Sequence, residues 1–327
     1  MIRENANAHL WSIILAGGDG KRIRPFIEQW LGYPLPKQFC TFVGTRSMLQ
    51  HTLDRADCLS HPEKKMTVFC LPHRHLVRTH FDHPLAGQVI LQPQNCNTAP
   101  GVFLPLTYVL ARDPHATVVI YPSDHFVFPE KRFVETVQQA IRAAEMLTDR
   151  LILLGACPTS LELEYGWMER GSLLGCSNGT RLHQIKSFIE KPEAMQGFTS
   201  MTNSTLWNTL VVATKAQTLW NRGWECFPEL MGRFAQLSRA IGTVRERQIL
   251  HAIYQDMPPR NISSDLLQRI PDCIAVIELK GVLWSDWGRP ERIVKTLGLL
   301  GKTPAFPTEH LIDRPRARYD TSAVEVL

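Results

Sequence analysis

The chain lacks paired cysteine motifs, long apolar runs and a strong net charge. Its eight cysteines never form a C-x-x-C pair, so reduced thiols are expected rather than disulfides or a zinc site. No run of about 18 apolar residues occurs, and residues 1–10 lack the apolar core of a signal peptide. A net charge of +5 over 327 residues is too dilute to favour nucleic acid or a membrane as a partner. The expectation is a cytoplasmic globular protein.

A glycine-rich turn near the start of the chain is the most informative stretch. The apolar residues 13–16 predict a buried strand, which is followed by Gly17, Gly18 and Gly20 and then by the cation of Arg22. Glycines leave backbone N–H groups free to close around an anion. Neither a P-loop nor a dinucleotide-binding turn fits the spacing. A polyphosphate turn of another kind and a plain solvated turn both remain open from these residues alone.

Residues 15–22 (LAGGDGKR) and 36–39 (PKQF) resemble the signature of the sugar-1-phosphate nucleotidyltransferases. The PKQF segment is most similar to that of the mannose-1-phosphate guanylyltransferases. Further stretches follow in the family's order: 92–100 (QPQNCNTAP), 121–125 (YPSDH), 165–169 (YGWME), 188–192 (FIEKP), 207–210 (WNTL) and 284–288 (WSDWG). The resemblance implies a Rossmann-like, three-layer α/β nucleotidyltransferase fold of the glycosyltransferase-A-like type.

The order of apolar segments agrees with that fold class. Strands and helices alternate up to residue 155, which predicts right-handed crossovers and a mostly parallel mixed sheet. Residues 166–192 form short segments of alternating polarity that are joined by glycine and asparagine turns, which predicts a small antiparallel addition. The strands are expected near 13–16, 67–71, 89–91, 117–121 and 151–155, with further strand material over 274–283 that is broken at residues 280–281. The helices are expected near 48–56, 74–81, 99–111, 130–147, 227–241, 246–254 and 290–300.

The expected organisation is a catalytic domain over residues 1–303 and a tail over 304–327. Within the domain, a nucleotide-binding half spans about residues 10–160 and a sugar-binding half about 161–303, as the order of the motifs implies. The tail has too little periodicity for an assignment. Contact with a second subunit, and hence a homodimer, is its predicted role.

Nucleotidyl transfer requires cations for two phosphate groups and carboxylates for a hard metal ion. The resemblance makes Arg22 and Lys37 the triphosphate-binding and phosphate-activating residues, and it makes Asp124 and Asp286 the ligands of Mg²⁺. The plainer alternatives are exposed cations for the first two residues, a helix cap for Asp124 and a turn residue for Asp286. His125 is interpreted as structural, because a sugar phosphate is already anionic near neutral pH and needs no general base.

Further substrate contacts follow from the same resemblance. Besides the three glycines of the turn, Asn97 and Thr98 are implied at the nucleotide, although Thr98 could simply cap a helix. The sugar phosphate is assigned to four residues: Gly166, Glu190, Lys191 and Asn208. Gly166 would allow a close backbone approach to the sugar, while Glu190 would hold hydroxyls and Lys191 the phosphate.

Several positions depart from the family pattern. Gln92 replaces an acid, Cys96 an arginine, Leu210 a glycine and Trp287 a valine. The leading hypothesis is an enzyme that joins GTP and mannose 1-phosphate with Mg²⁺ to give GDP-mannose and pyrophosphate. The first three departures keep open a nucleotidyltransferase for another base or sugar. A catalytically silent sensor of nucleotide sugars is the third hypothesis, and the complete set of metal and phosphate residues argues against it.

Overall fold

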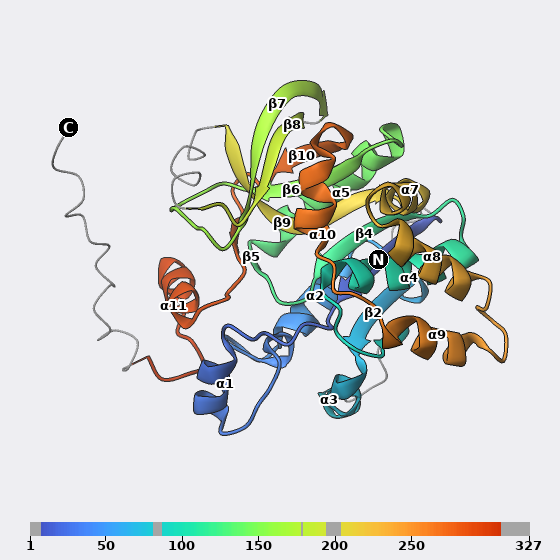
Figure 1. Cartoon of the computed structure of the whole chain (residues 1–327). Helices are drawn as coiled ribbons and strands as arrows, with labels where there is room; N and C mark the ends of the chain where they lie inside the picture. The colour runs from blue at the N-terminus through green and yellow to red at the C-terminus, as the bar shows by residue number, and fades with distance from the viewer. Residues whose placement is uncertain (1–7, 81–86, 178, 194–203, 309–327) are drawn as a thin grey trace, which may run out of the picture.

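The computed structural model describes residues 8–80, 87–177, 179–193 and 204–308 (Figure 1). Within these residues, one nine-stranded sheet has the order β3-β2-β1-β4-β9-β6-β10-β8-β7. The strands are β1 (Leu10–Leu15), β2 (Lys65–Cys70), β3 (Gln88–Gln92), β4 (Thr117–Pro122), β6 (Leu151–Ala156), β7 (Gly166–Ser177), β8 (Thr180–Glu190), β9 (Thr205–Lys215) and β10 (Ile274–Glu278). Strands β5 (Phe126–Phe128) and β11 (Leu283–Ser285) form a separate antiparallel pair.

Most strands of the large sheet share one direction. Strands β3, β2, β1 and β4 are mutually parallel, and β6 pairs in parallel with β10. Strand β9 lies between β4 and β6 and is antiparallel to both. The long β7–β8 hairpin adds the antiparallel edge that the glycine turns predict. The mostly parallel mixed sheet with a small antiparallel addition is therefore confirmed.

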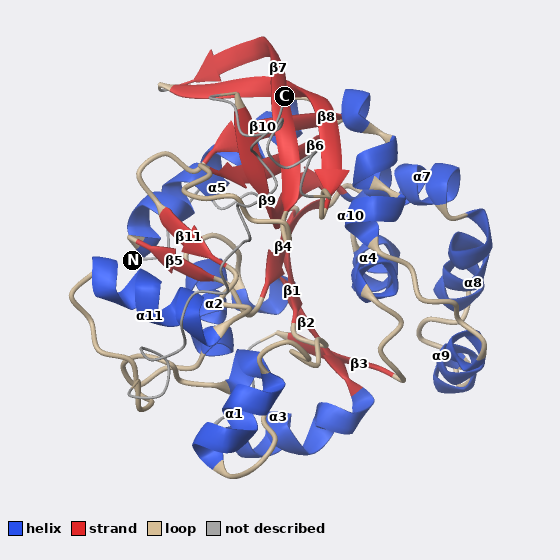
Figure 2. Ribbon diagram, turned by 60° about the vertical axis from the view of Figure 1, so that its left-hand side comes forward, coloured by secondary structure: helices blue, strands red, loops and turns tan. Residues whose placement is uncertain are grey.

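Helices cover both faces of the sheet, so the domain has three layers (Figure 2). The helices are α1 (Arg24–Leu31), α2 (Met48–Asp57), α3 (Arg74–His80), α4 (Thr98–Arg112), α5 (Glu130–Met146), α7 (Ala216–Cys226), α8 (Pro228–Ser238), α9 (Glu246–Gln255), α10 (Ile262–Asp265) and α11 (Pro290–Leu299). Helices α4, α7, α8 and α9 share a core with one sheet face, and α2 and α5 share another core with the opposite face. Alternation in the strands explains this, because Trp11 and Ile13 point to the first core and Leu10 and Ile14 to the second.

A third, smaller core lies beside the carboxyl end of β1. Ile27 of α1, Phe42, Trp287 and Ile293 of α11 pack there with Phe306. The Phe306 ring meets Phe42 edge-on with centroids 6.2 Å apart. This core fixes the segment around residue 287 against the segment that follows the glycine turn. The first residues of the predicted tail thus belong to the domain, while residues 309–327 and their predicted subunit contact lie outside the described residues.

The predicted elements are largely found, with several differences. The break predicted at residues 280–281 is confirmed, because β10 and β11 are separate strands with a turn between them at Gly281, which has a φ of +66°. Helices α1 and α7 and the central strand β9 were not predicted. Among the described residues, no helix is both long and apolar enough to cross a membrane. The division into two halves at about residue 160 stays a prediction.

Candidate active site

The glycine turn follows β1 directly and is shaped by the side chain of Gln38. This amide is buried, and its Nε2 donates to the carbonyls of Ala16 and Gly18 at 2.8 and 3.0 Å. Gly20 has a φ of +60°, and a Cβ there would lie 3.2 Å from the Cβ of Lys37. A Cβ on Gly17 would lie 2.6 Å from Nε2 of Gln92. The glycines therefore allow the turn to pack closely against these side chains.

Lys37 joins three segments that are far apart in the sequence. Its side chain is 4% exposed, and its Nζ lies 2.9 Å from Oδ2 of Asp124. The same Nζ donates to the backbone carbonyl of Asp286. Because the Lys37 backbone also packs on Gly20, one buried ammonium group lies beside the glycine turn and both predicted metal ligands.

Asp124 lies just past the carboxyl end of β4, at the edge where α/β sheets bind ligands. The preceding Ser123 donates its hydroxyl to the carbonyl of Leu15 at 2.7 Å, which ties this segment to the end of β1. Burial opposes ionisation of Asp124, but the nearby charge of Lys37 prevails and holds its pKa below the usual value. Burial lowers the pKa of His125, which favours a neutral ring. The prediction of a structural role for His125 agrees with its edge-on contact with Trp284, at a centroid distance of 5.2 Å.

Asp286 follows β11 and is almost completely surrounded by donors. Its Oδ1 accepts from the hydroxyl of Tyr165 at 2.8 Å, from the amide of Gly288 at 2.9 Å and from Arg292 at 2.9 Å. Its Oδ2 accepts from Arg22 at 2.9 Å. Burial opposes ionisation, yet Lys37 and the arginines hold the pKa of Asp286 well below its usual range. Asp286 is thus a buried, ionised carboxylate with one oxygen, Oδ2, that is only lightly engaged.

The packing around Trp287 shows how this large residue takes the place of the family's valine. Its indole is fully buried in the third core and stacks on Phe126, with centroids 4.4 Å apart and planes inclined by 13°. The residue has a φ of +45°, in the left-handed region that non-glycine residues rarely adopt. The neighbouring Asp286 is therefore held by core packing on one side and by hydrogen bonds on the other.

The residues predicted at the sugar come together on β7, β8 and β9. Gly166 pairs with Glu190 in the β7–β8 register, and a Cβ on Gly166 would lie 2.6 Å from Oε2 of Glu190 and 3.2 Å from the Cβ of Asn208. Burial raises the pKa of Glu190 despite the neighbouring cations. Lys191 is half-exposed, and its Nζ lies 3.9 Å from Oε1 of Glu190. Sequence reasoning thus located a real cluster, whereas its contacts with a sugar stay predictions.

Asn208 has a structural task that the sequence did not reveal. Its Oδ1 accepts from the backbone N–H of Leu210 at 2.9 Å, and Leu210 has a φ of +57°. The family's glycine at this position is thereby explained, since glycine adopts such a φ without strain. Leucine reaches the same backbone conformation here with the support of this hydrogen bond.

All of the predicted nucleotide residues except Gly20 line a cavity of about 270 Å³ beside the glycine turn. Its lining includes Gly17, Gly18, Asn97, Thr98 and Asp124, together with Gln92 and Leu210. Asn97, not Thr98, is the N-cap of α4, because its side chain accepts from the backbone of Thr98 at 2.8 Å. Thr98 accepts instead from the backbone of Ile262 at 2.9 Å, which links α4 to α10.

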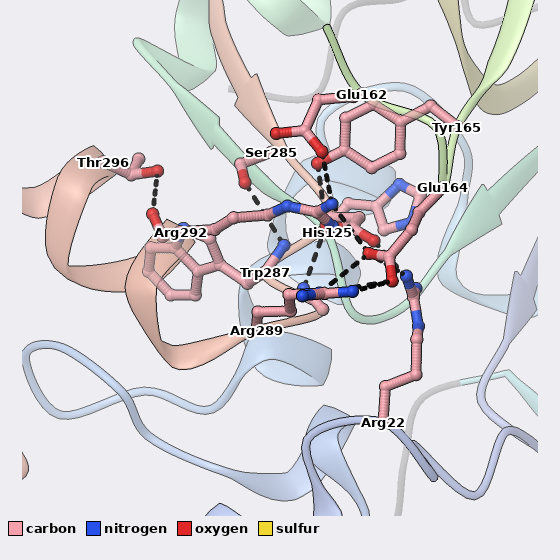
Figure 3. Close-up of polar contacts among 12 residues, drawn as sticks. Arg22, His125, Glu162, Glu164, Tyr165, Ser285, Trp287, Arg289, Arg292 and Thr296 are labelled. Atoms are coloured by element: carbon pink, nitrogen blue, oxygen red, sulfur yellow. Dashed lines mark hydrogen bonds and ion pairs between the residues drawn. The ribbon is translucent and has the colours of Figure 1, made fainter. Parts of the chain in front are cut away.

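A network of arginines and acids at the mouth of the site was missed in the sequence (Figure 3). Arg22, Arg289 and Arg292 converge on the carboxylate of Glu164, at 2.8, 2.6 and 2.7 Å. Arg292 also binds Glu162 at 2.5 Å. The only signal available was the proximity of these charges to the stretches 165–169 and 284–288.

The three-layer arrangement around a large, mostly parallel sheet defines a Rossmann-like α/β protein, with the glycine turn and the carboxylates at one edge of the sheet. The chain belongs to the nucleotidyl transferase family, which it matches over residues 11–296. That match includes every predicted site residue.

The chain is similar to curated relatives of known activity. It is 32% identical over 185 residues to a mannose-1-phosphate guanylyltransferase of Escherichia coli, a match that covers 55% of this chain and 38% of the relative. It is 26% identical over 292 residues to mannose-1-phosphate guanylyltransferase 2 of Escherichia coli O157:H7, over 86% of this chain and 59% of the relative. The chain therefore spans about half the length of the curated relatives it matches.

A solved structure shares the fold. A protein of Thermus thermophilus, described as a mannose-1-phosphate geranyltransferase, superposes with a TM-score of 0.71 at 21% identity. The superposition covers 88% of this chain and 79% of that one. At this identity the likeness establishes the fold alone.

Proposed function

We propose that the chain transfers a guanylyl group from GTP to mannose 1-phosphate, giving GDP-mannose and pyrophosphate. The observation that carries the proposal is the position of Lys37, whose buried ammonium group contacts both Asp124 and Asp286 beside the glycine turn. The names of the curated relatives support this pair of substrates.

In the proposed reaction, a phosphate oxygen of the sugar phosphate attacks the α-phosphorus of the nucleotide. The bond between this phosphorus and the oxygen that bridges it to the β-phosphorus breaks, and pyrophosphate leaves with the electron pair. The protein positions the two anions and neutralises their charge. Lys37 and Arg22 face the triphosphate, and Lys191 faces the sugar phosphate. No general base is required, because the attacking oxygen carries charge near neutral pH.

The carboxylates fit a magnesium ion. Mg²⁺ is usually bound by one or two carboxylates plus substrate phosphates and water. Asp124 and Asp286 supply two carboxylates, and Lys37 ties the two residues together through the side chain of Asp124 and the backbone carbonyl of Asp286. Among the described residues, the Oδ2 of Asp286 accepts only from Arg22, so it becomes available once the arginine turns to a phosphate. When bound, the ion would neutralise charge on the phosphates.

A direct assay tests the function. Purified protein with Mg²⁺, GTP and mannose 1-phosphate is expected to release pyrophosphate in step with GDP-mannose formation. Omission of either substrate is the control. Lack of release with every pair in a panel of nucleotides and sugar phosphates would refute the enzyme, and tight GDP-mannose binding without turnover would favour the sensor hypothesis instead.

Gln92 favours a second candidate, transfer of a different nucleotide. Its side chain is 3% exposed, lines the 270 Å³ cavity, and its Oε1 has no hydrogen-bond partner among the described residues. An amide offers a donor and an acceptor side by side, whereas a carboxylate only accepts. Such a pair matches the adjacent N–H and C=O groups of guanine and also those of uracil or thymine.

Rates of the wild type with the four nucleotides separate the two candidates, and the variant Gln92→Glu tests whether Gln92 contacts the base. A carboxylate can accept two N–H groups of guanine and meets the carbonyls of uracil or thymine with repulsion. The ratio of kcat/KM for GTP to that for UTP or dTTP should therefore rise by about tenfold or more. Rates with GTP, ATP, UTP and dTTP measure the ratio. An unchanged ratio would mean that Gln92 does not contact the base.

A further inference from the structure

Three arginine side chains surround the carboxylate of Glu164, as they would surround a bound anion. Its carboxylate accepts from Nη1 of Arg22 at 2.8 Å, from Nη2 of Arg289 at 2.6 Å and from Nη2 of Arg292 at 2.7 Å (Figure 3). Arg289 adds its Nε at 3.2 Å to each of the two oxygens. Burial opposes ionisation of Glu164, yet these arginines hold its pKa below the usual value. Arginines in such forked contacts bind phosphate groups by the same geometry.

The three arginines differ in the partners that they have besides Glu164. Arg292 is 12% exposed and keeps Asp286, Glu162 and the ring face of Tyr165 as partners. Arg289 is 59% exposed, and Glu164 is the only hydrogen-bond partner of its side chain among the described residues. If Glu164 withdrew, Arg292 would keep its other partners, whereas the Arg289 side chain would lose all of the hydrogen bonds that the described residues give it.

Arg22 connects this cluster to the glycine turn. A Cβ on Gly288 would lie 2.9 Å from Nη2 of Arg22 and 2.7 Å from Oδ2 of Asp286, so glycine is needed there for the arginine to reach this carboxylate. Glu164 belongs to residues 157–165, which form neither helix nor strand. Such a segment can shift without disturbing a hydrogen-bonded ladder.

We propose that Glu164 stands in for a phosphate of the nucleoside triphosphate, and that Arg289 joins Arg22 in binding the pyrophosphate end once Glu164 is displaced. The placement of Arg22 at the glycine turn selects the nucleotide rather than the sugar phosphate, which lies toward Lys191. Glu164 thus competes with the substrate for two arginines. The competition keeps these cations paired between turnovers and weakens retention of the leaving pyrophosphate.

Binding of inorganic pyrophosphate, measured by titration calorimetry without a divalent ion, tests the proposal. Glu164→Gln removes the competing charge and keeps the size, so pyrophosphate should bind about three- to tenfold more tightly, in line with the loss of partly exposed ion pairs. The matched control is Glu162→Gln. Glu162 comes from the same segment and, among the described residues, pairs with Arg292 but with neither Arg22 nor Arg289, so its affinity should stay within about twofold of the wild type.

Arg289→Gln supplies a second arm that does not depend on Glu164. This exposed substitution should weaken pyrophosphate binding about three- to tenfold and abolish the gain of Glu164→Gln when the two are combined. The KM for GTP should rise with the KM for mannose 1-phosphate unchanged. Unchanged or weaker binding by a folded Glu164→Gln variant, or unaltered binding by Arg289→Gln, would overturn the proposal.

The inference rests on the proposed nucleotidyl transfer, but the two fail differently. Pyrophosphate binding is read directly and requires no turnover. Absence of activity with every substrate pair would refute the function and leave the binding result intact. If Glu164→Gln had a lower melting temperature and the wild-type affinity for pyrophosphate, the network would serve only to stabilise the fold.

Discussion

Replacement of Lys37 by methionine is expected to lower kcat/KM by about 10² to 10³, the usual loss when one charged group that stabilises a transition state is removed. Methionine has nearly the length of lysine without its charge. The substitution removes the cation that binds the carboxylate of Asp124 and the backbone carbonyl of Asp286, so the pKa of Asp124 should rise. Steady-state rates of pyrophosphate release measure the loss.

The same substitution should reduce stability only moderately. Lys37 is buried, but the side chain of Asp124 is 34% exposed and can regain water, so the free energy of unfolding should fall by about 1–3 kcal/mol. Lys21→Met is the matched control, because Lys21 is an exposed lysine that directly follows Gly20 in the glycine turn. A fully active Lys37→Met variant would mean that the contacts of this lysine serve folding alone.

The sequence was most informative where one strand ends and a turn begins. Apolar runs located β1, β4 and β6, and the rule that ligands bind beyond carboxyl strand ends placed Gly17 and Asp124 at one edge. Their proximity is confirmed by the contact of Ser123 with Leu15. Periodicity sufficed there because each of these strands is buried along nearly its whole length.

Strand β9 was missed for a topological reason. Its sequence, TLWNTLVVATK, carries an asparagine and threonines in a strand that is mostly buried, so it shows no alternation, and its apolar run covers only residues 210–213. It inserts antiparallel between β4 and β6, a pairing that only the folded sheet reveals. The end of β9 that carries Asn208 also pairs with β7, with Trp207 opposite Trp167, and this pairing brings Asn208 to Gly166.

The network around Glu164 was beyond the reach of sequence patterns. Arg22, Glu164 and Arg289 belong to segments separated by more than a hundred residues, and surface charges follow no period. Small cores assembled from distant segments, such as that around Trp287, bring these charges together. The individual residues adjoin recognisable motifs, but their pairing is a property of the tertiary structure.

The largest effect is expected from Asp124→Asn, which should reduce pyrophosphate release by about 10³ or more, as for loss of a charged group at a metal-assisted phosphoryl centre. Asparagine keeps the shape of aspartate but lacks the charge that a hard cation requires. Binding of Mn²⁺ in the presence of GTP, followed by electron paramagnetic resonance, should weaken in parallel. This second measurement reads the metal site independently of turnover.

Asp57→Asn is the control that separates chemistry from folding. Asp57 is 43% exposed and pairs with the buried Lys65, much as Asp124 pairs with the buried Lys37. Both variants should therefore lose a similar stability, about 1–2 kcal/mol after allowance for exposure to solvent, and only Asp124→Asn should lose activity and Mn²⁺ binding. Equal activities of the two variants would show that Asp124 supports the fold without holding the metal, and the proposed catalytic assignment would fall.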